Sequence, residues 1–191
     1  MVAGGGRPRG GARARLAALG LVAMLAAAGV PAGTADAPAA PAAPEQRELR
    51  SYWHDGRVDY FGTATAMGQN AALSVFGYRF VRAECRVFAT QQPGTIPLQL
   101  WWSEALQDNA TVAAAASIAT VQAAGYDNKA TEGYVYAAER PGTVALKLYY
   151  SKRLDDYVTT TAATGEADAL AKGYRFVRVE GYALPLAATA R

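Results

Sequence analysis

The sequence predicts a strand-rich α+β domain of three ββαβ units, each about 48 residues long, in a closed, trefoil-like arrangement with pseudo-threefold symmetry. First, Gly-Tyr dipeptides begin at Gly77, Gly125 and Gly173, at intervals of 48 residues. Second, aromatic pairs recur in the same register: Tyr52-Trp53, Trp101-Trp102 and Tyr149-Tyr150. Third, an aspartate lies seven residues after the first ring of each pair: Asp59, Asp108 and Asp156. Repetition at a period of this length is typical of folds built from similar supersecondary units.

Each unit is predicted to contain the same elements in the same order. The aromatic pair opens a strand, a polar turn follows, and a second strand starts at the aspartate, as in residues 156–160, which are rich in β-branched side chains. Alanine-rich helices, each followed by a capping glycine, are predicted at residues 69–76, 117–124 and 165–172. We expect Thr161 or Thr164 to cap the third helix, with Glu166 favourable near that end. A longer strand, such as residues 174–184, closes the unit.

The closed arrangement follows from the need to bury apolar surface. One such unit cannot bury its own apolar face, whereas three faces that meet about one axis can. The unit boundaries are placed at residues 49–96, 97–144 and 145–187. We expect five aromatic residues to fill the shared core: Tyr78, Phe80, Tyr126, Tyr174 and Phe176. The single cysteine, Cys85, is expected to be a small buried residue, since one thiol forms no intramolecular disulfide.

The N-terminal segment predicts export. Residues 1–35 hold four arginines and no acidic residue, and residues 16–30 form one apolar run. This pattern is typical of a secretory signal peptide, with cleavage after Ala35 or Ala37. A retained membrane anchor is the alternative, although the apolar run is shorter than a membrane span requires. Residues 36–48 are rich in proline and alanine and predict an extended linker, so we expect a secreted or periplasmic protein.

Charge and motifs exclude several functions. The net charge of +3 belongs to the leader, because removing its four arginines leaves 15 basic residues against 16 acidic ones. The remainder lacks the excess of basic residues that nucleic-acid binding requires. His54 is the only histidine, which removes any histidine-cluster metal site, and the chain has no phosphate-binding or dinucleotide-binding fingerprint. We therefore expect no metal, no cofactor and no enzymatic activity.

The aspartate that follows an aromatic pair is the most site-like pattern in the chain. Sugar sites commonly combine an aromatic ring that covers the apolar face of the sugar with a carboxylate that accepts hydrogen bonds from the sugar hydroxyl groups. The candidate ligand-binding residues are Tyr149, Tyr150, Asp156, Tyr157, Trp53, Asp59, Tyr60, Trp102 and Asp108. The alternative is that each aspartate binds the backbone of its own turn. Glu84, Glu132 and Glu180 recur equally well, and we expect structural roles for them, including ion pairs with Arg82 or Arg178.

The third unit carries a family resemblance. The string from Leu148 to Thr160, followed by Gly173-Tyr174 and Glu180-Gly-Tyr182, resembles the secreted domain-of-unknown-function family 5648 over residues 50–186. The resemblance implies an exported module of three repeats, of the kind often attached to secreted hydrolases and suspected of binding carbohydrate. Two positions depart from the pattern: Asn109 stands where the family has an aromatic residue, and Cys85 stands where it has glycine.

The function expected from these observations is an exported, non-enzymatic, lectin-like module with one to three equivalent shallow sites for a glycan or a cell-surface polysaccharide. A protein-interaction or structural module of the cell envelope is the alternative, and a degenerate hydrolase is the third class. A binding module predicts similar shallow grooves, and an interaction module predicts an apolar patch. A hydrolase predicts one deep cleft with paired, perturbed carboxylates.

Overall fold

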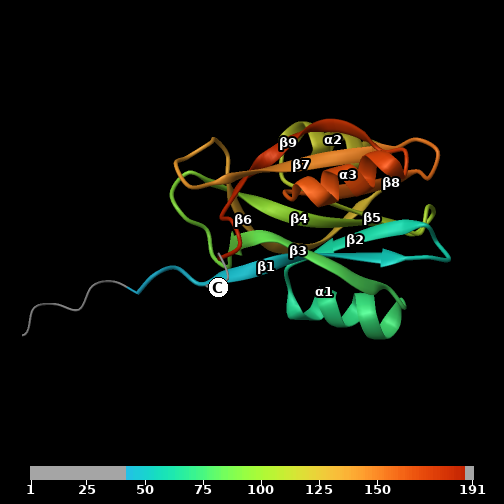
Figure 1. Ribbon diagram of the computed structural model, residues 1–191, viewed down its shortest axis with the longest axis horizontal. Coiled ribbons are helices and arrows are strands. Elements are labelled where there is room, and N and C mark those ends of the chain that lie inside the picture. Colours follow the sequence, from blue (N-terminus) through green and yellow to red (C-terminus); the bar gives the residue numbers. More distant parts are fainter. Residues whose placement is uncertain (1–41, 188–191) are drawn as a thin grey trace, which may run out of the picture. The chain divides into compact units, whose positions relative to one another are not determined.

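The computed structural model describes residues 42–187. The predicted signal peptide, its cleavage site and residues 36–41 of the predicted linker lie outside these residues. Within them, the order strand, strand, helix, strand occurs three times (Figure 1). Unit one contains β1 (Gln46–His54), β2 (Asp59–Thr63), α1 (Ala66–Asn70) with its π-helical continuation η1 (Ala71–Val75), and β3 (Arg79–Phe88). Unit two contains β4 (Thr95–Ser103), β5 (Asp108–Val112), α2 (Ala115–Ala123) and β6 (Asp127–Tyr136). Unit three contains β7 (Val144–Ser151), β8 (Asp156–Thr160), α3 (Ala163–Ala171) and β9 (Arg175–Ala183).

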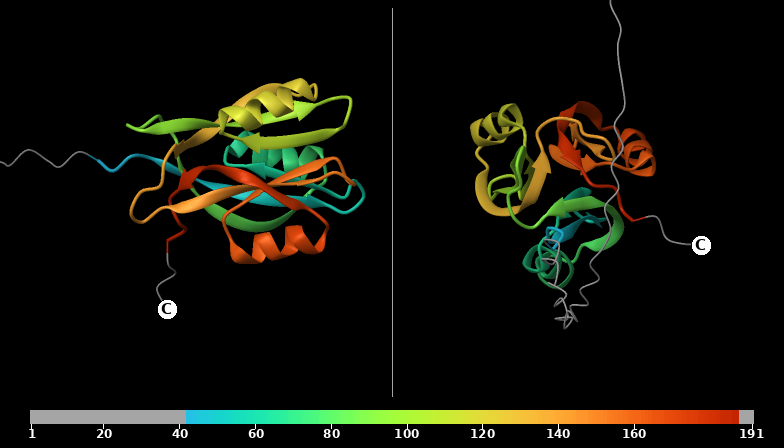
Figure 2. Two further views of the ribbon diagram at one scale, coloured as in Figure 1. Left: turned by 90° about the horizontal axis from the view of Figure 1, so that it is seen from above. Right: turned by 90° about the vertical axis from the view of Figure 1, so that its left-hand side faces the viewer.

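The strand-rich class is confirmed. All nine strands belong to one open antiparallel sheet, in which the first strand of each unit pairs with the other two strands of that unit. The helices lie on the outside of the strands (Figure 2). Pairing between units is brief: Phe88 pairs with Tyr134, and Tyr136 pairs with Tyr182. Strand β1 begins at Gln46, so the last three residues of the predicted linker belong to the sheet.

Both ends of the described chain join the end of β3. The backbone N–H of Ala89 donates to the carbonyl of Glu45 at 2.9 Å. Arg86 and Leu184 exchange two backbone hydrogen bonds, at 2.8 and 3.0 Å. The first and last residues of the fold therefore lie near each other, at the end of β1 that is remote from the β1–β2 turn.

The helix ends agree only partly with the sequence. Gly77, Gly125 and Gly173 follow the helices with φ of +73°, +84° and +89°, which confirms the predicted glycine caps. The predicted threonine cap of α3 was wrong, whereas Glu166 lies in the first turn as expected. The N-cap is Ala162, whose side chain has no acceptor, and the neighbouring Thr161 instead binds Glu84 of unit one: its N–H donates to the carboxylate at 3.2 Å and its hydroxyl donates to the backbone carbonyl.

The core contains three of the five predicted aromatic residues. Tyr78, Tyr126 and Tyr174 are buried at the ends of their helices. Phe80 and Phe176 were predicted wrongly: they are 50% and 53% exposed. They lie in the first halves of β3 and β9, where the strands are still exposed. Each packs edge-to-face with one neighbouring tyrosine, and the guanidinium of Arg50 lies 5.9 Å from the ring centre of Phe80.

The units also differ at one tightly packed position of the closing strand. A Cβ on Gly133 would lie 2.5 Å from Val87 Cγ2 and 2.7 Å from the carbonyl oxygen of Phe88. Gly181 would meet Val135 in the same way, at 2.7 Å. The corresponding residue in unit one is Cys85, which is fully buried as expected, in the core cluster that contains the smaller Ala183. A larger residue on one strand is thus matched by a smaller one on the next.

Replacing Gly133 with alanine should lower the free energy of unfolding by about 1–3 kcal/mol, because the added methyl group overpacks the contact with Val87. Adding Val87→Ala should recover part of the loss, although Val87→Ala alone is destabilising. Urea denaturation of the two single variants and the double variant measures this coupling. Additive losses would contradict the packing argument.

Candidate functional site

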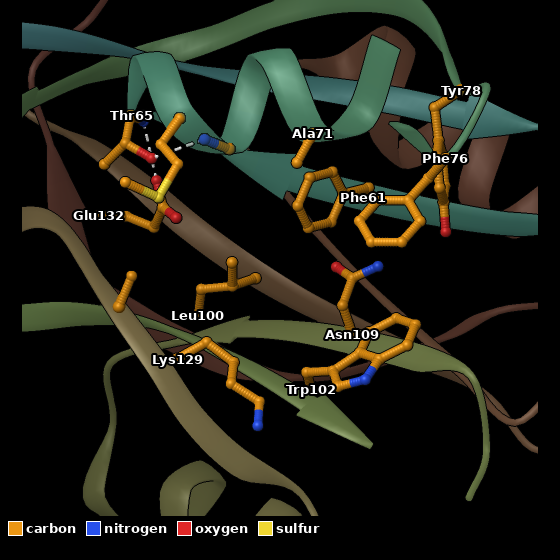
Figure 3. A pocket seen from close by; sticks show the side chains of 13 residues that line it. Phe61, Thr65, Ala71, Phe76, Tyr78, Leu100, Trp102, Asn109, Lys129 and Glu132 are labelled. Carbon is orange, nitrogen blue, oxygen red and sulfur yellow. Dashed lines mark hydrogen bonds between the residues drawn. The ribbon is translucent and has the colours of Figure 1, made fainter. Parts of the chain in front are cut away.

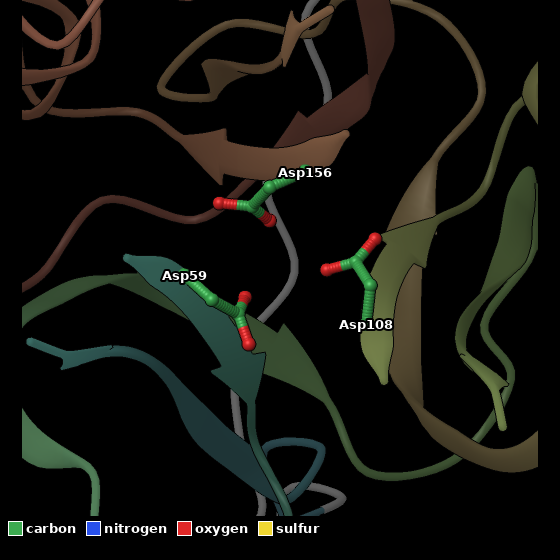
Figure 4. A group of neighbouring side chains, drawn as sticks. All are labelled: Asp59, Asp108 and Asp156. Carbon is green, nitrogen blue, oxygen red and sulfur yellow. The ribbon is translucent and has the colours of Figure 1, made fainter. Parts of the chain in front are cut away.

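Three aspartates from three units lie together. Asp59, Asp108 and Asp156 are the first residues of β2, β5 and β8, and carboxylate oxygens from all three lie within 4.8 Å of one another. The side chains point toward a common centre (Figure 4). They are 5%, 4% and 2% exposed. The expectation that each aspartate lies at its own shallow surface site was therefore wrong, because the hairpins that carry them converge.

The turn before each aspartate has the same backbone form. Val58, Gln107 and Asp155 have φ of 58°, 55° and 55°. None of the three is glycine, and the left-handed region is costly for a β-branched residue such as Val58. The chain therefore reaches each aspartate through a tight, strained turn, which fixes where β2, β5 and β8 begin.

A tyrosine orients each carboxylate. Its hydroxyl donates to the Oδ2 atom of the aspartate in the same unit, in the pairs Tyr78–Asp59, Tyr126–Asp108 and Tyr174–Asp156. The backbone N–H of Tyr60 also donates to Asp156 Oδ2, at 3.1 Å. The other oxygen, Oδ1, is buried in all three aspartates and has no hydrogen-bond partner among residues 42–187.

Burial raises the pKa values of all three carboxyl groups, and the charges of neighbouring aspartates raise those of Asp108 and Asp156 further. Burial raises the pKa of Asp59 to about 6, against the lowering effect of the hydrogen bond from Tyr78. Burial, and then the charge of Asp59, raise the pKa of Asp108 to about 8. The pKa of Asp156 is also raised well above its ordinary value, by burial and by the charges of both neighbours. The positive charge of the nearby Arg57 acts in the opposite direction and lowers the pKa of Asp59.

A cavity of about 380 Å³ lies at the aspartates. Besides the three carboxylates, its walls are formed by Arg57, Leu106, Gln107 and Leu154, which belong to the turns of the three hairpins. The cavity therefore connects the cluster with the turn end of the molecule.

A second hollow, which we call groove one, lies between the α1–η1 segment of unit one and the strands of unit two (Figure 3). Its volume is about 280 Å³, and most of its lining is apolar or aromatic. The rings of Phe76 and Trp102 stack with their centroids 6.0 Å apart and their planes at 22°. Phe76 is 37% exposed, and Trp102 is half-buried, so this aromatic pair borders solvent.

Groove one also contains a carboxylate. Glu132 is fully buried, and its Oε2 atom accepts from Thr63 Oγ1 at 2.8 Å and from the N–H groups of Ala64 and Thr65 at 2.6 and 2.9 Å. Its Oε1 atom has no partner in the described part of the chain. Lys129 and Asn109 add a cation and an amide to the lining. The groove thus places an aromatic surface, a carboxylate and two further polar groups in one hollow.

Groove two, with a volume of about 310 Å³, is the equivalent hollow between α2 and unit three. Tyr150 takes the place of Trp102 and Tyr157 that of Asn109, and their rings lie 4.6 Å apart. Arg178 takes the place of Ala130, and its Nε atom has no partner among the described residues. Groove two is therefore related to groove one in position but differs in chemistry.

The third junction, between α3 and unit one, is filled. The hydroxyl of Tyr60 donates to Asp168, which also forms ion pairs with Arg82 and Lys172. The ammonium group of Lys172 lies 5.1 Å from the ring centre of Trp53. These contacts occupy the space that corresponds to the grooves at the other two junctions.

The predicted ligand-binding residues are therefore divided among several environments. Asp59, Asp108 and Asp156 form the buried cluster, and Trp53, Tyr60 and Tyr149 are buried in the core. Trp102 lines groove one, and Tyr150 and Tyr157 line groove two. Alternation along the strands explains the division in units two and three: the first ring of each pair, Trp101 or Tyr149, is buried, and the second is half-exposed. In unit one, α3 covers the second ring as well.

The recurring glutamates connect units, as their predicted structural role implies. Glu132 binds the start of α1, Glu180 the start of α2 and Glu84 the start of α3. The ion pair of Arg82 with Glu84 is present, at 2.9 Å. The alternative pair of Arg178 with Glu180 is not among the ion pairs of residues 42–187.

Sequence reasoning missed Phe76 and the carboxylate of Glu132 as groove residues. One signal was available for the glutamate: Ala130 replaces the arginine that precedes the glutamate by two residues in the other units, so Glu132 lacks that counterion. Phe76 gave no signal, because its contact with Trp102 joins two different units.

Comparison with known proteins gives one family. No helix in the described part of the chain is long and apolar enough to cross a membrane. No curated protein and no solved structure matches the chain. Residues 48–184 match the model of a domain of unknown function, DUF5648. That match covers more than half of the chain and agrees with the resemblance of the third unit, so the protein belongs to the DUF5648 family.

Proposed function

We propose that the protein is an exported, non-enzymatic binding module for carbohydrate, with its principal ligand site in groove one. The observation that carries the proposal is the combination of the stacked Phe76 and Trp102 rings with Glu132 in the lining of one hollow; the buried Oε1 atom of Glu132 has no hydrogen-bond partner among residues 42–187. In a sugar site, an aromatic ring covers the apolar face of the sugar, and a carboxylate oxygen accepts hydrogen bonds from the sugar hydroxyl groups. The ammonium group of Lys129 supplies further donors for ring and hydroxyl oxygens beside its ion pair with Asp127 at 3.6 Å, whereas the amide of Asn109 donates to the carbonyl of Tyr60 at 3.0 Å. Export rests on the arginine-rich leader and its apolar run.

The proposal includes closure of the three units about a pseudo-threefold axis. It is supported by the glutamate contacts, which run from unit two to unit one, from unit three to unit two, and from unit one back to unit three. The meeting of one aspartate from each unit supports the same arrangement. In the end-on view of Figure 2 the units lie around a common centre. Closure creates equivalent junctions, and two of them contain grooves.

A glycan-array screen of the purified protein tests the proposed function. We expect specific binding that Trp102→Ala lowers by at least about tenfold, a loss of about 1.4 kcal/mol, because the aromatic surface is removed. Tyr150→Ala is the matched control, since it truncates the equivalent ring of groove two. Equal loss in both variants would contradict the assignment to groove one, and no signal from folded protein would contradict the carbohydrate proposal for the glycans printed.

A protein-interaction module is the second candidate, favoured by one observation. Met67, Leu73 and Val75 on α1–η1 are 83%, 50% and 67% exposed. An apolar surface of this kind suits contact with another protein of the cell envelope. Replacing Leu73 and Val75 with aspartate separates the candidates: glycan binding persists if groove one is the functional site, whereas capture of an envelope partner is lost if this surface is.

A further inference from the structure

Each aspartate of the cluster has one buried carboxylate oxygen that no described residue binds. A buried carboxylate oxygen without a hydrogen bond is costly. Among residues 42–187, three such oxygens, the Oδ1 atoms, belong to side chains that face one another. Each Oδ2 atom is already occupied by a tyrosine hydroxyl, so the Oδ1 atoms are the ones left for a further group. That group must be positively charged or must donate hydrogen bonds, and it must be small enough to lie among three carboxylates.

We propose that Asp59, Asp108 and Asp156 bind one hard divalent cation, with Ca²⁺ as the best match. The donor atoms are all carboxylate oxygens, which Ca²⁺ prefers, and no sulfur or nitrogen ligand belongs to the cluster. Oxygens that bind one Ca²⁺ at 2.3–2.6 Å lie at most about 5 Å apart, and the ligand atoms here lie within 4.8 Å of one another. This proposal does not depend on sugar binding in groove one.

The surroundings suit such a site. Each carboxylate is oriented by a hydrogen bond to its Oδ2 atom, donated by the hydroxyl of Tyr78, Tyr126 or Tyr174. Metal ligands are commonly oriented by hydrogen bonds of this kind. Ca²⁺ takes 6–8 oxygen ligands, so three carboxylates leave positions for water or a ligand hydroxyl. The adjoining cavity of about 380 Å³ has room for them. Arg57, on the cavity wall, offsets part of the charge of the three carboxylates.

The geometry favours a cation site over the acid–base pair of a hydrolase. An acid and a base need two carboxyl groups in different environments, so that one is protonated and the other ionised. The three aspartates differ in environment, since Asp156 also accepts from the N–H of Tyr60 and the pKa values of Asp59 and Asp108 are about 6 and about 8. An acid–base pair, however, would use two carboxyl groups and leave the third without a role, whereas a single central ion takes one Oδ1 atom, free of partners among residues 42–187, from each of the three units.

Titration of the full chain with CaCl₂ tests the proposal. Starting from chelator-treated protein, Ca²⁺ should raise the midpoint of thermal unfolding in a saturable way, and EDTA should reverse the change. Tb³⁺, which takes the same oxygen ligands, should show luminescence sensitised by the tyrosines that contact the cluster, and Ca²⁺ should displace it. KCl at matched ionic strength should do neither. Absence of a Ca²⁺ response in the wild-type chain, or an equal response to KCl, would overturn the proposal.

Variants locate the site. Asp108→Asn keeps the shape of the side chain and removes one anionic ligand, so it should weaken Ca²⁺ binding by at least tenfold and abolish the sensitised Tb³⁺ signal. Glu139→Gln is the matched control, because it removes one negative charge from an exposed position and should leave both signals unchanged. Unchanged binding in folded Asp108→Asn protein would overturn the assignment. If that variant fails to fold by circular dichroism, the wild-type titration and Tb³⁺ displacement still decide.

Discussion

Replacing Glu180 with alanine should lower the free energy of unfolding by about 3–5 kcal/mol, because three donors lose their acceptor at about 1–3 kcal/mol each; this is one of the largest losses expected from any single substitution in this protein. Glu180 is 1% exposed, and it accepts from the N–H groups of Ala113 and Ala114, both at 2.8 Å, and from the hydroxyl of Ser117. Without it the start of α2 keeps buried donors and no acceptor, since Ala114 makes no side-chain cap.

Urea denaturation at neutral pH measures this loss. Glu180→Gln should cost less than Glu180→Ala, because the amide oxygen still accepts from the two backbone donors. Glu139→Ala, which truncates an exposed glutamate, should stay within about 0.5 kcal/mol of the wild type. A loss below about 1 kcal/mol for Glu180→Ala would show that this junction between units two and three contributes little to stability.

The metal-free protein should become more stable as the pH falls from 8 to about 5.5. Asp59, Asp108 and Asp156 have pKa values above those of an unfolded chain, so in this range the folded state binds more protons than the unfolded state. Stability therefore decreases as the pH rises through the folded pKa values, about 6 for Asp59 and about 8 for Asp108. The shift at Asp59 alone corresponds to a cost on the order of 3 kcal/mol at pH 8.

Thermal unfolding in EDTA across this pH range measures the effect. The lower limit avoids protonation of Glu166, whose pKa is lowered by its hydrogen bond with Lys147 and whose contribution to stability is lost only at more acid pH. Asp108→Asn should flatten the profile and should exceed the wild type in stability at pH 8. A wild-type profile that rises with pH across the window would contradict the repulsion described for the cluster.

The repeat period of the sequence was sufficient to predict the helices and strands but not the contacts between units. It predicted the three helices to within a few residues and the second strands from their first aspartate onward. It could not predict that Asp59, Asp108 and Asp156 converge, because equal spacing along the chain is compatible both with three separate sites and with one central site. Groove one likewise depends on a contact between Phe76 and Trp102, which belong to different units.

Compensation between units was equally hidden. In units one and three, the hydroxyl that binds the neighbouring glutamate comes from the strand, from Thr63 or Thr160, and the corresponding helix position is glycine. In unit two the strand has Val112 at that position, and the hydroxyl comes from the helix residue Ser117. The two substitutions in unit two therefore preserve the interaction together. A comparison of the units position by position counts them as two unrelated mismatches.

Exchanging that pair tests the equivalence. The double variant Val112→Thr with Ser117→Gly should be within about 1 kcal/mol of the wild type, because the strand hydroxyl replaces the one lost from the helix. Ser117→Gly alone should be clearly less stable, since Glu180 loses a donor. Urea denaturation of the variants gives the comparison, and equal stabilities of the single and double variants would contradict it.

The pairing of Glu45 and Leu184 with the end of β3 has a consequence for how the domain is displayed. The chain enters the fold at Glu45 and leaves it at Leu184, and both residues lie at the same pole, the end of the sheet where β3 ends. β1 has 9 residues and therefore spans about 30 Å, and it separates this pole from the hairpin turns that line the aspartate cavity. The hairpin turns and the described chain ends lie at opposite ends of the strands (Figure 1), so a domain tethered by either end has the turns that line the cavity at the end remote from the tether.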